Sequence, residues 1–484
     1  MNRPLLSGGL VLALAGLALT ACDDVNTVAR PTAPVVLTGS QVSSLVGTAP
    51  GRIVAFRHAL VDGEPVWTQV PVQVDQRKVV AFGSQPAANG TAGVAGTVYG
   101  NGSGGPTSLV YADPNTFVGA DTDPNLDADD EVVFMASDAG GKVRADDATQ
   151  PAGVVAGSGV AVQLDDPRDD DEQGWVYLFA STGSLSPSAG KDYVKYTFSL
   201  TSGAYKTTYL RAAGPNPETS KVVTPTYEAS FTDRWMETSW KVRASGASGV
   251  DVLDGAKSQF APGTCGRSNV TFTQGEGAFV ANIDGPVRAI RSYVGANSGP
   301  LTQRTHLMYR DREDVVTNLR VHAIPGVMDF VDLSTAAKGM TYRSSTVPGG
   351  VKVDGVADVV STDLPTWESV DGPQGQLFSR STFTSTVAGL AAGTRQFYRD
   401  ATTPATNEPQ CWGDGSFIGA TGPAVQTEIP DTDPRNGVPA TVTSTRVTQF
   451  AAPAADKAKI AAAAADWSAD LAAPLVATVS RYQP

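Results

Sequence analysis

Oxygen-bearing side chains recur at every second position of the segment 121–131. The candidate ligands are Asp121, Asp123, Asn125, Asp127 and Asp129. Calcium is a hard cation that takes six to eight oxygen ligands at about 2.3 to 2.6 Å, and a loop with this spacing can wrap around one ion. The sequence therefore predicts a structural calcium site. The alternative is an acidic turn that is solvated by water and holds no ion.

Candidates for acid–base chemistry gather in a second region. They are His306, His322, Glu368, Arg304, Arg310 and Arg320. A histidine can transfer a proton near neutral pH, and arginine can neutralise the carboxylate of a uronate sugar. The histidines lie in two adjacent predicted strands, 301–310 and 315–324. A shift of one residue in register turns every side chain to the other face, so the histidines either share one surface or are unconnected.

Two tryptophans lie in segments rich in Gly, Pro and Asp, a composition typical of surface loops. Aromatic faces stack on sugar rings, so Trp367 and Trp412 are candidate ligand-stacking residues, although many tryptophans pack in cores instead. The sequence contains no GxSxG, HExxH, P-loop or GxGxxG signature. We therefore expect no nucleotide partner, and no hydrolase signature indicates a catalytic centre.

The N-terminus has the order of a secretion signal. Arg3 precedes an apolar stretch at 5–19, and small residues lead to Cys22. This order resembles a bacterial lipoprotein signal, which implies removal of residues 1–21 and lipid attachment to Cys22. We expect a protein outside the cytoplasm, anchored to a membrane at the cell surface or the periplasmic face. A plain transmembrane anchor is the alternative, but a spanning helix needs about 20 apolar residues.

Two further cysteines, Cys265 and Cys411, remain after this assignment. Disulfides form and persist outside the cytoplasm, so the pair predicts one disulfide. The alternative is two free buried thiols. Neither cysteine belongs to a CxxC motif or lies near a histidine in the sequence, which disfavours a zinc site at this pair.

The chain is acidic, with a formal net charge of −13. Binding to nucleic acid requires clustered Lys and Arg against the phosphates, so we expect no nucleic-acid partner. The same balance disfavours electrostatic docking on anionic lipid. We therefore expect membrane contact through the lipid anchor.

Short β-branched or aromatic runs separated by Gly, Pro, Asn and Asp continue from residue 52 onward. They predict a mostly β protein, a large antiparallel β-sandwich of one or two packed domains with long loops. The Ala-rich segment 455–471 predicts a short C-terminal helix. The expected organisation is a signal peptide at 1–21, a flexible tether at 22–50, an N-terminal β region with the acidic loop at 51–185, the main sandwich at 186–450, and a C-terminal helix and tail at 451–484.

Three stretches together carry a family resemblance. They are Val70-Pro-Val-Gln73-Val-Asp75, Asp129-Asp-Glu131-Val-Val-Phe134-Met-Ala136 and Asp284-Gly285-Pro286-Val287-Arg288-Ala289-Ile290. These stretches are similar to segments of large secreted β-sandwich proteins with a galactose-mutarotase-like fold, including rhamnogalacturonan exolyase-like proteins. The resemblance implies a broad twisted sandwich whose concave face could hold a saccharide. It assigns no catalytic residue in this chain.

These features favour a non-enzymatic function. We expect a membrane-tethered lipoprotein that binds polysaccharide or another envelope component. One alternative is a polysaccharide-active lyase or epimerase, which requires the His and Arg candidates to converge in one cleft. Another is a structural component of a surface layer. The sequence leaves open whether the protein is an enzyme.

Overall fold

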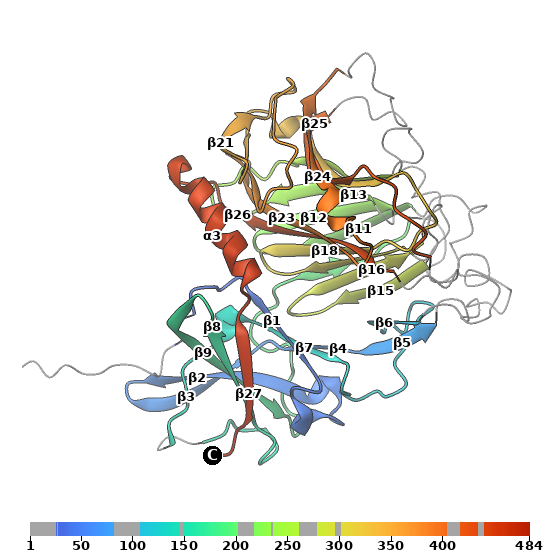
Figure 1. Cartoon of the computed structure of the whole chain (residues 1–484). Helices are drawn as coiled ribbons and strands as arrows, with labels where there is room; N and C mark the ends of the chain where they lie inside the picture. The colour runs from blue at the N-terminus through green and yellow to red at the C-terminus, as the bar shows by residue number, and fades with distance from the viewer. Residues whose placement is uncertain are drawn as a thin grey trace, which may run out of the picture.

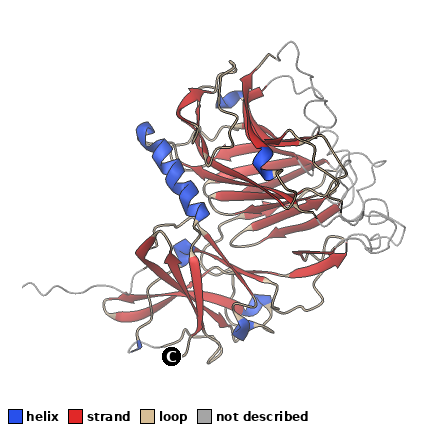
Figure 2. Ribbon diagram, viewed as in Figure 1, coloured by secondary structure: helices blue, strands red, loops and turns tan. Residues whose placement is uncertain are grey.

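Two β-rich lobes, one above the other in Figure 1, make up the protein. The computed structural model describes residues 26, 28–81, 107–145, 149–201, 217–233, 236–260, 278–295, 302–403, 417–433 and 440–484. Strands dominate both lobes, as Figure 2 shows, and all strand pairs between the named strands are antiparallel. The predicted mostly β, antiparallel fold with one short C-terminal helix is confirmed.

The lower lobe contains three sheets. The first has the order β1 (Pro34–Thr38), β7 (Glu131–Met135), β4 (Gln73–Asp75); the second has the order β27 (Val476–Arg481), β8 (Val160–Asp166), β9 (Asp169–Ala180), β2 (Ile53–Val61), β3 (Glu64–Val70); the third is the pair β5 (Arg77–Ala81) and β6 (Thr107–Tyr111). Strand β8 alternates strictly, so Val160, Val162 and Leu164 face the core and their neighbours face outward. The first two sheets share one core.

The upper lobe is a large sandwich. Its nine-stranded sheet has the order β15 (Ala278–Asp284), β16 (Ala289–Val294), β17 (Gln303–Met308), β18 (Arg312–Asn318), β26 (Val442–Ala451), β23 (Gly375–Ser385), β22 (Glu368–Gly372), β20 (Thr341–Ser344), β21 (Val347–Lys352). The opposing layer contains two four-stranded sheets, β10 (Lys195–Thr197), β11 (Pro217–Val223), β12 (Tyr227–Asp233), β13 (Met236–Val242) and β14 (Leu253–Phe260), β19 (Val327–Leu333), β25 (Phe417–Val425), β24 (Thr394–Ala401). Phe450 of β26 stacks on Tyr227 of β12 at 4.1 Å between ring centroids, which joins the layers.

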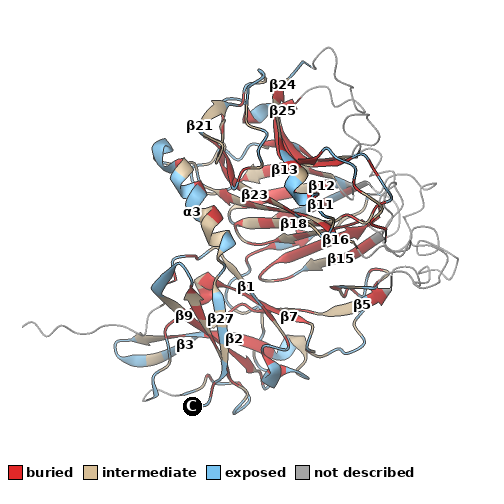
Figure 3. Ribbon diagram, in the orientation of Figure 1, coloured by how far each residue is buried: buried red, intermediate tan, exposed pale blue. Residues whose placement is uncertain are grey.

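Helix α3 (Ile460–Ala472) lies against the upper lobe and leads directly into β27 of the lower lobe (Figure 1). It buries Ile460 and Ala464 against Trp367 and Phe378, and its outer side is exposed (Figure 3). The short 3-10 helices are η1 (Ser43–Leu45), η2 (Pro50–Arg52), η4 (Ala136–Asp138), η8 (Thr335–Ala337), η9 (Ala391–Gly393) and η11 (Lys457–Lys459). None of the helices in the described part of the chain has the length and apolar character needed to cross a bilayer.

Two segments differ from their predicted organisation. The predicted tether at 22–50 includes β1, which pairs with β7, and it buries Val35, Leu37 and Leu45 in the lower core. Its Pro and Thr content concealed the alternation of apolar residues that makes β1 a strand. The predicted tail likewise contains β27, which pairs with β8 along six residues. Strand β1 thus forms one edge of the three-stranded sheet, and strand β27 forms one edge of the five-stranded sheet.

Arg288 joins the two lobes. Its Nε donates to Oδ2 of Asp75 at 2.9 Å, its Nη2 pairs with Glu131, and its Nη1 donates to the hydroxyl of Tyr309 at 3.2 Å. Asp75 lies on β4 and Glu131 on β7, whereas Arg288 directly precedes β16 of the upper lobe. The side chains of Arg288 and Asp75 are each 1% exposed. Removing one partner of such a buried pair costs about 3 to 5 kcal/mol, so the ion pairs hold the lobes together.

Gln73 completes this junction through the backbone. Its Oε1 accepts hydrogen bonds from the backbone N–H groups of Val287 at 3.1 Å and Arg288 at 3.0 Å, and its Nε2 donates to Asp75 Oδ1 at 2.7 Å. A Cβ atom on Gly285 would lie 2.2 Å from Gln73 Oε1, so only glycine allows this approach. Burial opposes ionisation of Glu131, but the charges of Arg288 and Arg77 outweigh burial and hold the pKa of Glu131 below its usual value. The three stretches that carry the family resemblance therefore meet at one junction.

Candidate functional site

Two arginines, a histidine and a valine form a row across the inner face of the nine-stranded sheet. The register places Arg291 of β16 opposite His306 of β17, His306 opposite Val315 of β18, and Val315 opposite Arg446 of β26. Residues that pair directly across antiparallel strands share a face, so these side chains all point into the sandwich. The four residues are buried. The interior of the upper lobe is thus polar along this row.

Two glutamates complete a cluster around His306. His306 Nδ1 lies 2.8 Å from Glu313 Oε1, and Glu237 of β13 approaches from the opposing layer. One ligand atom from each of these three residues lies within 4.8 Å of the other two. Glu237 Oε1 accepts a hydrogen bond from the indole Nε1 of Trp240 at 2.7 Å. The cluster therefore combines one imidazole and two carboxyl groups, all buried in the protein interior.

Burial sets the protonation of this cluster. It raises the pKa of Glu237 to about 8 and the pKa of Glu313 to about 7, in both cases because water is excluded from the carboxyl group. Burial also lowers the pKa of His306 to about 3, despite the negative charge of Glu237 nearby. At neutral pH the imidazole is neutral and, without a bound cation, the glutamate pair retains a proton. Such shifts are common in functional sites and also in buried structural networks.

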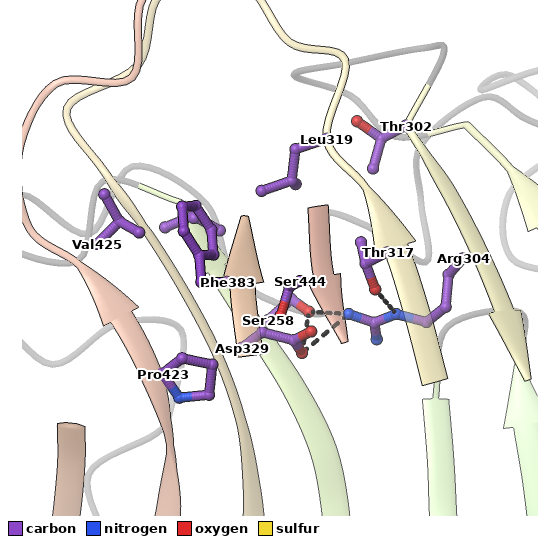
Figure 4. Close-up of a pocket in the computed structure, with 11 residues that line it drawn as sticks. Ser258, Thr302, Arg304, Thr317, Leu319, Asp329, Phe383, Pro423, Val425 and Ser444 are labelled. Atoms are coloured by element: carbon purple, nitrogen blue, oxygen red, sulfur yellow. Dashed lines mark hydrogen bonds and ion pairs between the residues drawn. The ribbon is translucent and has the colours of Figure 1, made fainter. Parts of the chain in front are cut away.

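Arg304 borders a small cavity beside this cluster (Figure 4). Its Nη2 donates to Asp329 Oδ1 at 2.9 Å and to Ser258 Oγ at 2.9 Å, and its Nε donates to Thr317 Oγ1 at 3.0 Å. The cavity has a volume of about 20 Å³. One water molecule needs about 10 to 15 Å³, so the cavity has room for a single water molecule but not for a sugar ring.

Glu368 lies elsewhere in the same interior. Its Oε1 accepts hydrogen bonds from Tyr342 Oη at 2.9 Å, from Gln396 Nε2 at 2.7 Å and from the hydroxyl of Thr421. Burial raises the pKa of Glu368, although these three donors stabilise its charged form. The hydrogen-bond donors to Glu368 Oε1 come from both layers of the sandwich. Glu368 therefore links β22 to β24 and β25 of the opposing layer.

The structure does not bring the six acid–base candidates into one cleft. Arg310 pairs with the neighbouring Asp311 at 2.6 Å, and Arg320 donates to Ser108 Oγ at 3.1 Å. His322 is exposed, and its Nδ1 lies 2.9 Å from the backbone oxygen of the next residue. Strand β18 ends at Asn318, so Arg320 and His322 lie beyond the sheet that holds His306. Arg304 and His306 are neighbours on one face.

Sequence reasoning missed four charged members of the inner row and its cluster, namely Arg291, Arg446, Glu237 and Glu313. Glu313 was assigned to the turn before a strand expected to begin at residue 315, but β18 begins at Arg312. Its alternation of buried and half-buried residues places Glu313 on the same face as Val315. The period of two could have indicated this position if the strand had been extended toward the turn.

The acidic loop brings together a set of side chains that differs from the predicted one. Ligand atoms of Asp121, Asp127 and Asp130 lie within 4.8 Å of one another. Asp130 accepts hydrogen bonds from the backbone N–H groups of Arg77 at 2.7 Å and Asp127 at 2.9 Å. Burial raises the pKa of Asp130 to about 6. The structure thus adds Asp130, which the alternating pattern had left out.

The other predicted ligands of this loop shape its turns. The Asp123 carboxylate accepts a hydrogen bond from the backbone N–H of Asn125 at 3.0 Å, and the Asp127 carboxylate accepts one from the backbone N–H of Asp129 at 3.0 Å. Asp123 and Asp129 are not part of the group of three carboxylates. Local bonding to the backbone is a common role for such side chains in turns.

Trp367 is buried rather than available for stacking on a ligand. It packs with Phe378, Ile460 and Ala464, because α3 covers it. Trp367 does lie in the loop that directly precedes β22, but the prediction that it is accessible to a ligand is wrong. Trp412, Cys22, Cys265 and Cys411 lie outside the described residues, so their predicted roles stay predictions.

A groove far larger than the cavity beside Arg304 lies in the lower lobe, on the outer face of β8, β9 and β27. It has a volume of about 700 Å³. The lining residues are Lys142, Val143, Arg144, Ala145, Ala161, Gln163, Trp175, Tyr177, Thr478, Ser480, Arg481, Tyr482 and Gln483. The rings of Tyr177 and Tyr482 meet edge to face at 5.1 Å, and Lys142 Nζ lies 5.9 Å from the ring centroid of Trp175. Sequence reasoning did not identify this groove, because its parts come from distant segments.

Replacing Glu368 tests the protonation of the sandwich interior. The pKa of Glu368 is raised above its unfolded value of 4.5, so its stabilising contribution is complete below pH 4.5 and is lost as pH rises through the folded pKa. Glu368→Gln keeps the shape and stays neutral. We expect the unfolding free energy of this variant, relative to that of the parent, to increase with pH. The increase is about 1.4 kcal/mol for each pH unit between the unfolded and the folded pKa of Glu368. Urea titrations between about pH 4 and pH 9 measure it. A difference that is independent of pH would contradict this assignment.

Comparisons with known proteins give only distant likenesses. Neither a family model nor a curated protein sequence matches this chain. A solved structure from Escherichia coli K12, described as a candidate aldose 1-epimerase, has 8% sequence identity and a TM-score of 0.28, and the match covers 47% of this chain and 96% of that chain. The solved structure of the Slr1438 protein from Synechocystis sp. PCC 6803 has 9% identity and a TM-score of 0.28, and covers 49% of this chain and 97% of its own. Both likenesses are weak.

Proposed function

We propose that this protein is an extracytoplasmic lipoprotein, tethered to a membrane through lipid on Cys22, that binds polysaccharide or another envelope component without chemical turnover. The observation that supports binding is the difference between the two hollows. The lower groove has a volume of about 700 Å³, whereas the cavity beside Arg304 has about 20 Å³. Ligand sites in proteins are typically about 300 to 1,000 Å³, so the lower groove is the better candidate.

The side chains of the groove suit a saccharide. Strand β27 directs Thr478 and Ser480 toward the groove, and its Val479 packs on the lower core. Hydroxyl and amide groups can bond sugar hydroxyls, while Trp175, Tyr177 and Tyr482 are largely buried and form the floor of the groove. Arg481 adds an exposed guanidinium that can bind a carboxylate or phosphate group on the ligand.

Ligand binding through this groove can be measured with a glycan array followed by titration calorimetry. Arg481→Ala should weaken binding by about 10- to 150-fold, because a charge-assisted hydrogen bond contributes about 1.5 to 3 kcal/mol. Ser480→Trp should abolish binding by filling the groove. Arg395→Ala, which changes an exposed arginine of the upper lobe, is the matched control and should bind normally. An array without any ligand, or unchanged binding by both groove variants, would count against the proposal.

The lipid anchor is proposed from the N-terminal signal. Cells that express the parent chain and are fed labelled palmitate should incorporate the label into the protein. Cys22→Ser should lose the label, whereas Cys265→Ser should retain it. Persistent labelling of the Cys22 variant, or no labelling of the parent, would rule out attachment at this position.

We propose that Asp121, Asp127 and Asp130 bind a structural calcium ion. Free calcium at 100 times its dissociation constant stabilises a folded protein by about 2.7 kcal/mol, so EDTA should lower the Tm of a chain of this length, unfolding as one unit, by about 3 °C. Asp127→Asn should remove this response. Asp123→Asn is the control, because Asp123 lies outside the group of three carboxylates. An unchanged Tm of the parent in EDTA would mean that the loop is an acidic turn only.

A polysaccharide-active lyase or epimerase is the second candidate function. The observation that favours it is the buried group of His306, Glu313 and Glu237 next to Arg304, in which raised and lowered pKa values coexist. General acid–base catalysis requires a substrate within hydrogen-bonding reach of such groups. The narrow cavity beside Arg304 gives a substrate no room, and for this reason binding is the preferred function.

A further inference from the structure

Three strands from both layers of the upper sandwich supply a compact set of metal-ligating groups. Glu237 comes from β13, His306 from β17 and Glu313 from β18. Their side chains are 0%, 3% and 1% exposed, and one ligand atom of each lies within 4.8 Å of the others. The three residues are far apart in sequence or on different strands, so the sandwich itself brings them together.

Two carboxylate oxygens in this set have no hydrogen-bond donor. Glu237 Oε2 and Glu313 Oε2 are buried and receive no hydrogen bond from another described residue, although the two carboxyl groups lie within hydrogen-bonding reach of each other if one is protonated. The other oxygen of each carboxyl group has a partner. Glu237 Oε1 accepts a hydrogen bond from Trp240 Nε1 at 2.7 Å, and Glu313 Oε1 lies 2.8 Å from His306 Nδ1. Buried polar groups in folded proteins almost always have a partner, so a proton or a cation must satisfy these oxygens.

The surrounding arginines do not neutralise the carboxylates of Glu237 and Glu313. Arg291 is bonded to Glu218 at 2.6 Å, and Arg304 is bonded to Asp329 at 2.9 Å. The charge of Arg446 acts on both glutamates, but its Nε and Nη1 donate to no acceptor in the described part of the chain. The two carboxylates therefore lack a direct cationic partner, and one divalent ion would neutralise both.

We propose that Glu237, His306 and Glu313 bind one zinc ion inside the upper sandwich. Zinc accepts imidazole nitrogen and carboxylate oxygen, commonly from three or four protein groups, at about 2.0 to 2.2 Å. Calcium takes oxygen ligands only, so the imidazole distinguishes this site from the acidic loop. With two carboxylates, one neutral imidazole and a divalent ion, the charges of the site balance. The ion would link β13 of one layer to β17 and β18 of the other.

Metal analysis of the full chain tests this proposal. The protein is refolded with zinc in the presence of excess calcium, which occupies any oxygen-only site, and is then dialysed and measured by plasma mass spectrometry. We expect one zinc ion for each chain. Glu237→Gln and His306→Gln should each lower the zinc content more than tenfold. Glu368→Gln, an isosteric change of another buried glutamate in the same interior, and His322→Gln, at an exposed histidine, should retain the zinc.

X-ray absorption on the parent protein keeps the proposal testable if the cluster variants do not fold. The expected first shell contains one imidazole nitrogen with oxygens and no sulfur. A sulfur shell would place the ion on cysteines and overturn the proposal, as would zinc that remains in a folded His306→Gln variant. A folded parent without zinc would also overturn it, and an infrared band of a protonated carboxyl would then show that the glutamates share a proton instead.

Discussion

The ion pairs of Arg288 with Asp75 and Glu131 are the contact on which the arrangement of the two lobes depends. All three charges are removed from water, and each is tolerated there only because its partners are in place. Gln73 fixes the backbone of Val287 and Arg288 and also bonds Asp75. The lower lobe therefore supplies the acceptors and the upper lobe supplies the cation, so neither half of the junction is satisfied without the other.

This junction also connects the candidate sites. Arg77 donates from its side chain to Glu131 at 2.8 Å and from its backbone to Asp130, so the acidic loop lies next to the Arg288 pairs. A calcium ion on this loop would stiffen the lower side of the junction. The groove is connected to the upper lobe by the chain itself and not by the Arg288 ion pairs. Strand β27 forms one of its walls and follows directly from α3, which lies on the upper lobe. The C-terminal segment from α3 to β27 thus links the two lobes.

Much of the fold followed from local patterns in the sequence, whereas the site did not. The alternating runs predicted the strands, and the Ala-rich segment predicted α3, because period and composition are local properties. Trp367 was expected to be exposed because the helix that covers its loop is almost a hundred positions later in the chain. Glu313 and Glu237 were missed because their meeting depends on register and on the packing of two layers. The three stretches of the family resemblance each looked structural, and the structure brings them together around Arg288.

The most direct test is differential scanning calorimetry of Arg288→Met beside the parent chain. The parent should unfold in one cooperative transition that includes both lobes. The variant leaves Asp75 and Glu131 buried without their cation, so it should lose about 3 to 5 kcal/mol and unfold at a clearly lower temperature, with the lobes separating into two transitions. Arg168→Met removes exposed ion pairs with Asp466 and Asp470 and should leave the unfolding temperature close to that of the parent. A single transition at the parental Tm in the Arg288 variant would contradict the central role of this junction.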